Sequence, residues 1–371
     1  VPICEIVSSV IAMAASFRTS FLALTVAMWP PLMMREGCMV DLIPSEAMSG
    51  ILSENENLHN YWYVVTRSAD LTTAPAGATL LGRNLVLWRD TSNIVHAAPD
   101  RCPHREGVLS NGTVENGCLV CPYHGWTYDL RGRLRAAARE ADFLGPFKRE
   151  DWPLSTLRCQ ERAGLIWVAL GDDPLPLEAQ LDLLLEEAGA CLEQPRQLLR
   201  RRQLNLDCNW KIAHDNTLDD YHVAIAHPTT LHREQGPVRH YRHAISDHAT
   251  LLATPYPDGG EFLTFGLAPW THLLLWPDGR LALIQFPPLD VERCRMEIWL
   301  LGHTTHEEQA DAWMEQLQSF LEEDKRLVEA AQLGYRTGFT PGPAHRLERR
   351  ILQQQSLYRQ LMGISDSELL A

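Results

Sequence analysis

Short runs of β-type residues, separated by turn residues, dominate the chain between residues 57 and 171. Apolar, aromatic and β-branched side chains are concentrated at residues 61–65, 79–81, 84–88, 94–97 and 164–170. Turn pairs such as Asn111–Gly112 and Arg131–Gly132 lie between the runs. This pattern predicts a small all-β domain over residues 57–171 whose loops hold a functional group.

Residues 172–371 show a different pattern, in which helical periodicity alternates with strand-like runs. Helices are predicted over residues 177–190, 307–334 and 348–362, and strands over 261–265, 272–275, 281–286 and 295–302. The predicted fold class is α+β: an N-terminal all-β domain, then a domain with an antiparallel sheet flanked by helices. Residues 39–56 are expected to pack on that second domain.

The first 34 residues are apolar and contain only two charged side chains, Glu5 and Arg18. Arg18 and the pair Pro30–Pro31 divide them into pieces shorter than the ~20 residues that span a bilayer. No basic segment precedes the apolar run, as a signal peptide would require. We therefore expect residues 1–38 to be an extension, either disordered or translated from a misassigned start, and we expect no membrane association.

The net charge of −14 and a pI near 5.5 argue against a nucleic-acid partner, which requires a basic surface. The nine cysteines are odd in number and scattered. A chain of this length needs no disulfide framework, so we expect a reducing compartment, the cytoplasm, and metal binding by the cysteines that lie near histidines.

Two such pairs are Cys102-Pro-His104 and Cys121-Pro-Tyr-His124, separated by sixteen residues. A [2Fe–2S] cluster takes four ligands, and two histidines on one iron raise its reduction potential. Because each loop supplies one thiolate and one imidazole, each iron would take one ligand from each loop. A Cys₂His₂ zinc site remains open, although structural zinc more often pairs like residues within a loop.

A second constellation is Asp219-x₂-His222-x₄-His227-Pro228. Histidines five residues apart lie about 140° apart on a straight helix, so they would not face one ion. Pro228 disfavours helical geometry at His227, which frees that side chain to turn back. Two histidines and one carboxylate are the ligand set of non-haem Fe(II) oxygenases.

The carboxylate is predicted on the helical run 313–332, where Asp324 lies on the apolar stripe. An acid facing the core needs a partner, either a metal or a buried salt bridge, and both interpretations stay open. The neighbouring acids Glu322, Glu323 and Glu329 are interpreted as solvated, and so is Asp220 beside Asp219.

Both constellations together resemble the α subunits of Rieske non-haem iron oxygenases, the terminal components of ring-hydroxylating oxygenases. The similarity lies in Cys102-Pro-His104-Arg105, Cys121-Pro-Tyr-His124-Gly125-Trp126, Asp219-x₂-His222-x₄-His227 and Glu323-Asp324-Lys325, and it covers residues 59–362. It implies a Rieske cluster on Cys102, His104, Cys121 and His124, and a mononuclear Fe(II) on His222, His227 and Asp324.

The resemblance further implies a head-to-tail homotrimer in which Asp219 joins His222 to His124 of a neighbouring subunit. Electrons would come from an NAD(P)H-dependent reductase, directly or through a ferredoxin, and O₂ would be used on a small aromatic substrate. Asn216 is expected to face the active site. Some relatives that act on quaternary amines carry Glu at the bridging position, so Asp219 favours the ordinary ring or side-chain oxygenases.

Hydroxylation, dihydroxylation and demethylation stay open, because all three can use the same iron site. The alternative function is a Rieske electron-transfer protein without oxygenase chemistry. Such a protein would need neither the Asp219, His222 and His227 set nor a second domain of some 200 residues.

Overall fold

A computed structural model describes residues 56–257, 259–337 and 342–361, all of which belong to one compact unit. The predictions for residues 1–38 and for 39–55 lie outside the described residues.

The first region is built from three small antiparallel sheets, after a short helix α3 (Glu56–His59). The first sheet contains β1 (Tyr63–Arg67), β10 (Leu165–Ala169) and β9 (Arg158–Arg162), and the second contains β2 (Ala76–Leu80), β3 (Arg83–Arg89) and β4 (Val95–Pro99). The third contains β5 (Thr113–Glu115), β6 (Cys118–Val120), β7 (Thr127–Tyr128) and β8 (Leu134–Ala136). The all-β prediction for this region is confirmed.

A compact aromatic and aliphatic core lies beneath the loops that follow β4 and β6. Trp88, Trp126 and Tyr128 are almost fully buried in it, together with Leu109 and Leu119. Burial of large rings is strongly favourable and fixes their neighbours, so the core gives the loops a rigid base. The loops carry Cys102 and Cys121.

The second region contains a seven-stranded sheet in the order β11-β17-β16-β15-β14-β13-β12, with every neighbouring pair antiparallel. The strands are β11 (Gln197–Leu206), β12 (Arg242–Ile245), β13 (Ala249–Pro255), β14 (Glu261–Leu267), β15 (Thr271–Leu275), β16 (Leu281–Gln285) and β17 (Cys294–Gly302). The helices are α4 (Leu177–Gln180), α5 (Asp182–Leu192), α6 (Trp210–Leu218), α7 (Val223–Ala226), α8 (Leu231–Gln235), α9 (Ala310–Tyr335) and α10 (Arg349–Leu361). The α+β prediction is confirmed.

The helix predicted over residues 177–190 is divided into α4 and α5 at Leu181, where φ is −105° and ψ is 14°. The fully buried amide of Gln180 hydrogen-bonds both the N–H and the C=O of Trp62. This long-range contact is consistent with tertiary structure overriding local helical propensity at the break.

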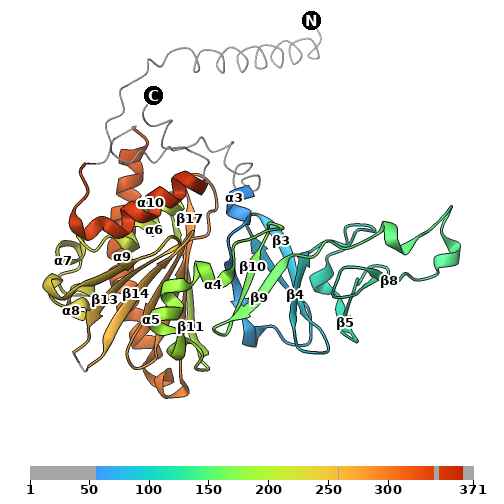
Figure 1. The fold of residues 1–371 in the computed structure, drawn as a ribbon, viewed down its shortest axis with the longest axis horizontal. Helices are drawn as coiled ribbons and strands as arrows, with labels where there is room; N and C mark the ends of the chain where they lie inside the picture. Colours follow the sequence, from blue (N-terminus) through green and yellow to red (C-terminus); the bar gives the residue numbers. More distant parts are fainter. Residues whose placement is uncertain (1–55, 258, 338–341, 362–371) are drawn as a thin grey trace, which may run out of the picture. The chain divides into compact units, whose positions relative to one another are not determined.

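The two faces of the sheet pack against different helices (Figure 1). On β15, Leu274 belongs to the core shared with α6, α9 and α10, whereas Leu273 and Leu275 belong to the core shared with α5. This alternation is the two-residue period of a strand buried on both sides. In the part of the chain that the structure describes, no helix combines the length and apolar character needed for a bilayer span.

Candidate functional site

The two loops of the first region bring four ligand-type side chains together. The backbone N–H of Cys102 donates to Gly107 O at 2.9 Å, and that of Cys121 donates to Trp126 O at 2.8 Å. Both thiols are buried, and each raises the cost of ionising the other. The ring centroids of His104 and His124 are 4.5 Å apart.

The chemistry of this donor set fits a cluster. Nδ1 of His104 is buried and, among the described residues, has no hydrogen-bond partner, as expected of a nitrogen that ligates a metal. A Cβ at Gly107 would lie 3.1 Å from Cys121 Sγ, and one at Gly112 would lie 2.1 Å from Val120 O, so both loops approach the site closely. Two thiolates and two imidazoles match a Rieske site.

Aromatic rings fix the imidazoles. His104 stacks on Trp126 at 4.5 Å with an interplanar angle of 2°, and Tyr123 stacks on His124 at 3.9 Å. Tyr128 Oη is 3.5 Å from Cys102 Sγ. Burial raises the pKa of the Cys102 thiol, and the hydrogen bond from Tyr128 partly opposes this increase. The cysteine side of the site is therefore buried, whereas His124 is exposed to solvent.

In the second region, the two predicted histidines flank a single helical turn. Helix α6 begins after Asn209, whose side chain accepts a hydrogen bond from Lys211 N, and it ends at Leu218. Asp219 is extended (φ −86°, ψ 102°), so the helix is already interrupted before His222, which the sequence did not indicate. His222 precedes α7, and His227 follows it with φ −122° and ψ 46°. Their Nε2 atoms lie 3.2 Å apart.

Asp324 on α9 completes the group. Its Oδ1 lies 2.9 Å from His227 Nε2 and 3.3 Å from His222 Nε2, and the three ligand atoms lie within 4.8 Å of one another. Two imidazole nitrogens and one carboxylate oxygen thus converge on one point, which is the donor set of a mononuclear Fe(II) site with open positions.

The electrostatics of this group are dominated by its acids. Burial lowers the pKa of His222, but the hydrogen bonds and charges of Asp219 and Asp324 outweigh burial and raise the pKa to about 10. Burial raises the pKa of Asp324, but the two histidines outweigh it and lower the pKa to about 2. The pKa of His227 is raised in the same way. The site therefore favours a positive charge between these side chains.

A carboxylate lies behind each histidine. Asp219 Oδ2 is 3.4 Å from His222 Nδ1, and its Oδ1 accepts hydrogen bonds from the N–H groups of Tyr221 and His222. Glu323 Oε2 is 2.6 Å from His227 Nδ1. Such acids fix the tautomer and orientation of a ligating histidine. The interpretation of Glu323 as solvated was wrong, because its partner is 96 residues away and helical periodicity does not reveal it.

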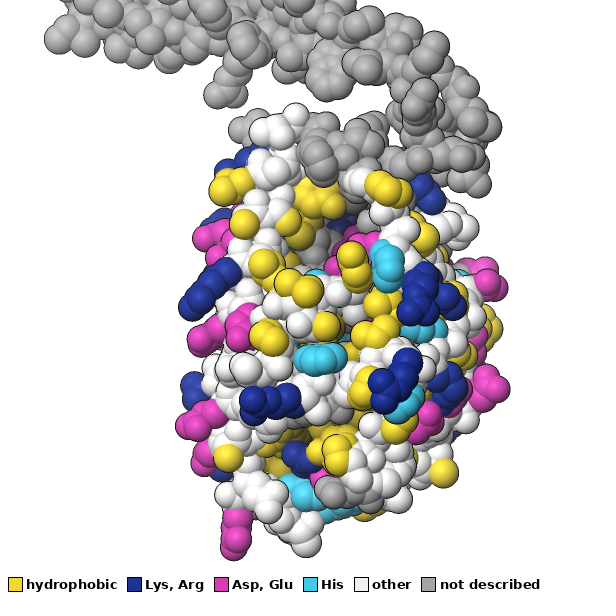
Figure 2. All heavy atoms as spheres, turned by 90° about the vertical axis from the view of Figure 1, so that its left-hand side faces the viewer, with side chains coloured by type: hydrophobic (Ala, Val, Ile, Leu, Met, Phe, Trp, Pro, Cys, Tyr) yellow, Lys and Arg dark blue, Asp and Glu magenta, His cyan; other side chains and the backbone are white. Residues whose placement is uncertain are grey.

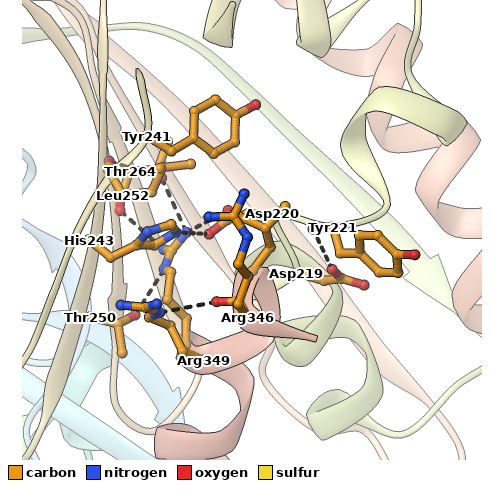
Figure 3. A network of polar contacts seen from close by, with 12 residues as sticks. Asp219, Asp220, Tyr221, Tyr241, His243, Thr250, Leu252, Thr264, Arg346 and Arg349 are labelled. Carbon is orange, nitrogen blue, oxygen red and sulfur yellow. Dashed lines mark hydrogen bonds and ion pairs between the residues drawn. The ribbon is translucent and has the colours of Figure 1, made fainter. Parts of the chain in front are cut away.

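Asp220 is also not solvated. Its side chain is 3% exposed, Oδ1 accepts a hydrogen bond from Arg350 Nη1 at 3.1 Å, and Oδ2 is 2.8 Å from His243 Nε2 (Figure 3). Arg350 itself is fully buried. Polar residues beside a metal motif resemble a surface loop in sequence, and only the tertiary fold supplies their partners.

A pocket opens next to His222 and Asp324. Its wall includes the predicted residue Asn216, together with Asp219, Val223, Leu231, Gln235, Thr264, His272, Leu274, Ile284, Phe320 and Leu321. The sequence missed His272, which burial keeps neutral by lowering its pKa far below the usual value. Its Nδ1 is buried and lacks a well-aligned hydrogen-bond partner among the described residues. The wall thus combines apolar side chains with at least as many polar ones, which can orient a bound small molecule.

The face that carries α7 and α8 shows hydrophobic and histidine side chains in its middle, with acidic side chains mostly toward its edges (Figure 2). Ile225, on α7 between the two predicted iron ligands, is 83% exposed, and Tyr221 is 53% exposed. Both side chains lie at the surface close in sequence to the buried group of His222, His227 and Asp324.

Both parts of the chain match known protein families. Residues 61–148 match the Rieske [2Fe-2S] domain family, and residues 196–258 match the catalytic domain of the ring-hydroxylating alpha subunit family. The oxygenase subunit of carnitine monooxygenase from Escherichia coli (strain K12) is 30% identical over 304 residues, which cover 76% of this chain and 80% of the relative.

Two further relatives extend the comparison. The oxygenase component of chloroacetanilide N-alkylformylase from Rhizorhabdus wittichii (strain DC-6 / KACC 16600) is 34% identical over 177 residues, which are 48% of this chain and 49% of the relative. A solved quaternary ammonium Rieske monooxygenase, described for carnitine oxidation and inter-subunit electron transfer, has a TM-score of 0.67 at 22% identity. That match covers 87% of this chain and 95% of the solved chain, and it establishes the shared fold. The chain belongs to the Rieske non-haem iron oxygenase α subunits, the terminal components that combine a [2Fe–2S] domain with a catalytic domain that binds mononuclear iron.

Proposed function

We propose that this chain monooxygenates a small substrate by inserting one oxygen atom of O₂ into a C–H bond. Two electrons and two protons reduce the second oxygen atom to water, and the electrons come from NAD(P)H through a reductase. When the hydroxylated carbon is a methyl group on nitrogen or oxygen, the C–N or C–O bond of the hydroxymethyl product then breaks, which releases formaldehyde and leaves the demethylated compound. The observation that carries this proposal is the convergence of His222, His227 and Asp324 beside a pocket.

Each side chain has a defined role in this proposal. Cys102, His104, Cys121 and His124 hold the cluster, and His222, His227 and Asp324 hold the iron. Bound Fe(II) supplies the redox chemistry with O₂ that organic side chains lack. Asp219 orients His222 through Nδ1, Glu323 orients His227, and Asn216 lies on the pocket wall. The apolar side chains Leu274, Ile284 and Phe320 exclude water from the reacting carbon.

The electron route is proposed to cross between subunits of a homotrimer, from the cluster through His124 of one subunit to Asp219 and His222 of the next. Exposed apolar groups lie at both ends of this route, Tyr123 beside His124 and Ile225 beside His222. The two parts of the chain also differ in their balance of charge. Residues 57–171 contain 13 basic and 11 acidic side chains, whereas the rest of the chain contains 20 basic and 36 acidic ones.

The redox partner is proposed to be an NAD(P)H-dependent reductase in the cytoplasm that acts directly or through a ferredoxin. It would approach the cluster domain from a side that the neighbouring subunit does not cover, because His124 itself faces that subunit in the proposed route. Arg101 precedes the proposed cluster ligand Cys102 and is 71% exposed in its side chain, although it lies 3.6 Å from Glu106.

The pocket favours an uncharged or aromatic substrate over a quaternary ammonium ion. Recognition of such cations generally uses several aromatic faces, and Phe320 is the only non-histidine aromatic residue among the described lining residues. Asp220 on the wall is already paired with Arg350. A quaternary amine is the second candidate substrate, because carnitine monooxygenase is among the relatives.

Metal analysis and turnover test this function. We expect about three irons and two acid-labile sulfides per chain, by ligand count. Substrate-dependent NADH and O₂ consumption is measured with a surrogate reductase on aromatic acids, heteroaromatics, methoxy-aromatics and L-carnitine. Turnover of carnitine alone would reject the aromatic class, and about two irons per chain would reject oxygenase chemistry in favour of electron transfer.

A variant of the bridging acid tests the route itself. Asp219→Asn is expected to retain both metals and to lose turnover by about 100-fold, because the amide neither carries the charge nor orients His222 as the carboxylate does. The control is Asp173→Asn, which changes an exposed acid in the linker after the first region. Normal turnover in Asp219→Asn would refute the interface route.

A further inference from the structure

We propose that the C-terminal segment 345–358 is a clamp that positions the Asp219–His222 loop for electron transfer, with the buried pair Arg350–Asp220 at its centre. This C-terminal clamp rests on the proposed route through Asp219. It adds positioning residues that lie outside the metal ligands and the bridging acid.

The central pair is completely enclosed. Arg350 on α10 is 0% exposed and Asp220 is 3% exposed, with Nη1 and Oδ1 3.1 Å apart. Arg350 also donates from Nη2 to Thr264 O at 3.1 Å and from Nε to Thr250 Oγ1 at 3.3 Å. The guanidinium thus ties the loop to strands β13 and β14, and His243 of β12 contacts the other oxygen of Asp220 (Figure 3).

A pair this deeply buried is weak evidence for a gain in stability, because desolvation offsets most of its attraction. A planar guanidinium with several fixed partners instead specifies one geometry. Asp220 lies between the bridging Asp219 and the iron ligand His222. The backbone on which both depend is therefore held by Arg350.

Three further contacts from the same segment hold the neighbouring positions. The ring of His345 stacks on Tyr221 with centroids 4.1 Å apart. Gln355 Nε2 donates to Asp215 Oδ2 at 3.0 Å, and Tyr358 Oη lies 2.9 Å from His214 Nδ1. Asp219 lies between α6 and the loop residues Asp220 and Tyr221. Because the segment contacts both sides of it, Asp219 has little freedom to move.

The contact that the clamp would control, between Asp219 and His222, is longer than an ordinary hydrogen bond. Asp219 Oδ2 and His222 Nδ1 are 3.4 Å apart, so a small rotation of the loop would separate them. A misplacement of about 1 Å at a reacting geometry can reduce a rate about 100-fold. Loss of the clamp should therefore slow passage of one electron from the reduced cluster to the iron site, while both metals remain bound.

The test is a single turnover of the fully reduced, metal-loaded oxygenase mixed with O₂ and substrate, with cluster oxidation followed by visible absorbance. The main variant is the double substitution Arg350→Met with Asp220→Asn, which removes both charges and leaves neither buried alone. Arg350→Lys tests rescue by a conserved charge. Arg349→Met is the matched control, because Arg349 is an exposed arginine of the same helix.

We expect the double variant to keep three irons per chain and an unchanged cluster potential, and to oxidise its cluster about 10–100-fold more slowly. Its kcat should fall with little change in KM. Arg350→Lys should be intermediate, and Arg349→Met should match the parent. Adding Asp219→Asn to the double variant should cause little further loss, because both changes break one contact.

A wild-type rate of cluster oxidation in the double variant, alongside a slow Asp219→Asn, would overturn the clamp and leave the route intact. A wild-type rate in Asp219→Asn would instead overturn the route. If the double variant fails to load metals, His345→Asn and Gln355→Ala weaken the two ends of the clamp alone. Wild-type rates in both of those variants would likewise overturn the clamp.

Discussion

The cluster-binding region and the iron-binding region build their sites in opposite ways. All four cluster side chains lie within residues 102–124, on two short loops above one aromatic core. At the iron site, His227 and Asp324 are 97 residues apart and meet only through the fold. The first site depends on its own loops, whereas the second depends on the whole second region.

Their surroundings differ as well. The cluster side ends in the exposed ring of His124, while His227 is fully buried and backed by Glu323. A site that exchanges electrons with another protein needs a ligand at the protein surface, whereas a site that reacts with O₂ must exclude water. A substitution in one region should therefore leave the metal group of the other region in place.

The largest expected effect is that of Asp324→Ala. Loss of one of three ligands should remove the mononuclear iron, so iron falls from about three to about two per chain and turnover falls at least about 100-fold. The cluster absorbance should remain. Iron analysis with visible spectroscopy measures both, and Glu322→Ala, an exposed acid on the same helix, is the control. Loss of the cluster as well would show that the regions are not independent.

Iron affinity should depend steeply on pH. Fe(II) binds neutral imidazole, whereas Asp219 and Asp324 raise the pKa of His222 in the metal-free protein to about 10 despite its burial. Iron must therefore displace a proton, and affinity should rise about tenfold per pH unit from pH 7 to 9. Chelator competition across this range measures the slope. A flat profile would contradict the proposed ligand role of His222.

The stability of the metal-free protein should change with pH in the opposite direction to its affinity for iron. Because the folded-state pKa of His222 is raised above its unfolded value near 6.5, its proton stabilises the metal-free fold fully below that value. This contribution disappears as the pH rises through about 10. Iron loading thus compensates for a stabilisation that alkaline pH removes.

Glu323→Gln tests the buried iron-binding group alone, without altering the cluster loops. The amide keeps the size of the side chain but not its charge, so the orientation and basicity of His227 should weaken. Iron affinity should fall about tenfold, at the lower end of the range for such partners. Competition with a chelator measures it, and Glu322→Gln should leave affinity unchanged. A cluster potential that moved in Glu323→Gln would be unexpected.

The smallest effect should come from Tyr128→Phe on the cluster side. The hydroxyl lies 3.5 Å from Cys102 Sγ and stabilises the more negative reduced cluster. A hydrogen bond of about 0.5–1.5 kcal/mol corresponds to roughly 20–60 mV for one electron, so the potential should fall by that amount. Spectroelectrochemical titration measures it, with iron at the second site unchanged. A potential that rose would contradict this role.

The sequence could point to the proposed cluster residues because their spacing is local, and to the proximity of Asp324 to the two histidines because a carboxylate on an apolar helical stripe is conspicuous. Glu323, Arg350 and His272 could not be predicted. Glu323 and Arg350 contact partners far away in the chain, and only the fold brings His272 to the pocket wall. Periodicity records only which face of its element a side chain occupies.

The fold shows the same division. The predicted strands of the second region lie where alternation or short apolar runs mark them. Strand β11 (Gln197–Leu206) was missed because it is an edge strand that carries three consecutive arginines, Arg200–Arg202. An edge strand tolerates charged side chains, so its composition resembles a loop.

The separation of the iron-binding side chains sets an order of assembly during synthesis. His222 and His227 emerge from the ribosome first. Strands β12–β17 follow, and α9 with Asp324 emerges only after them. A complete set of donors cannot exist until six strands have emerged and paired. Iron uptake should therefore be a late event in maturation, whereas the cluster loops can be filled while the ribosome is still translating the sheet.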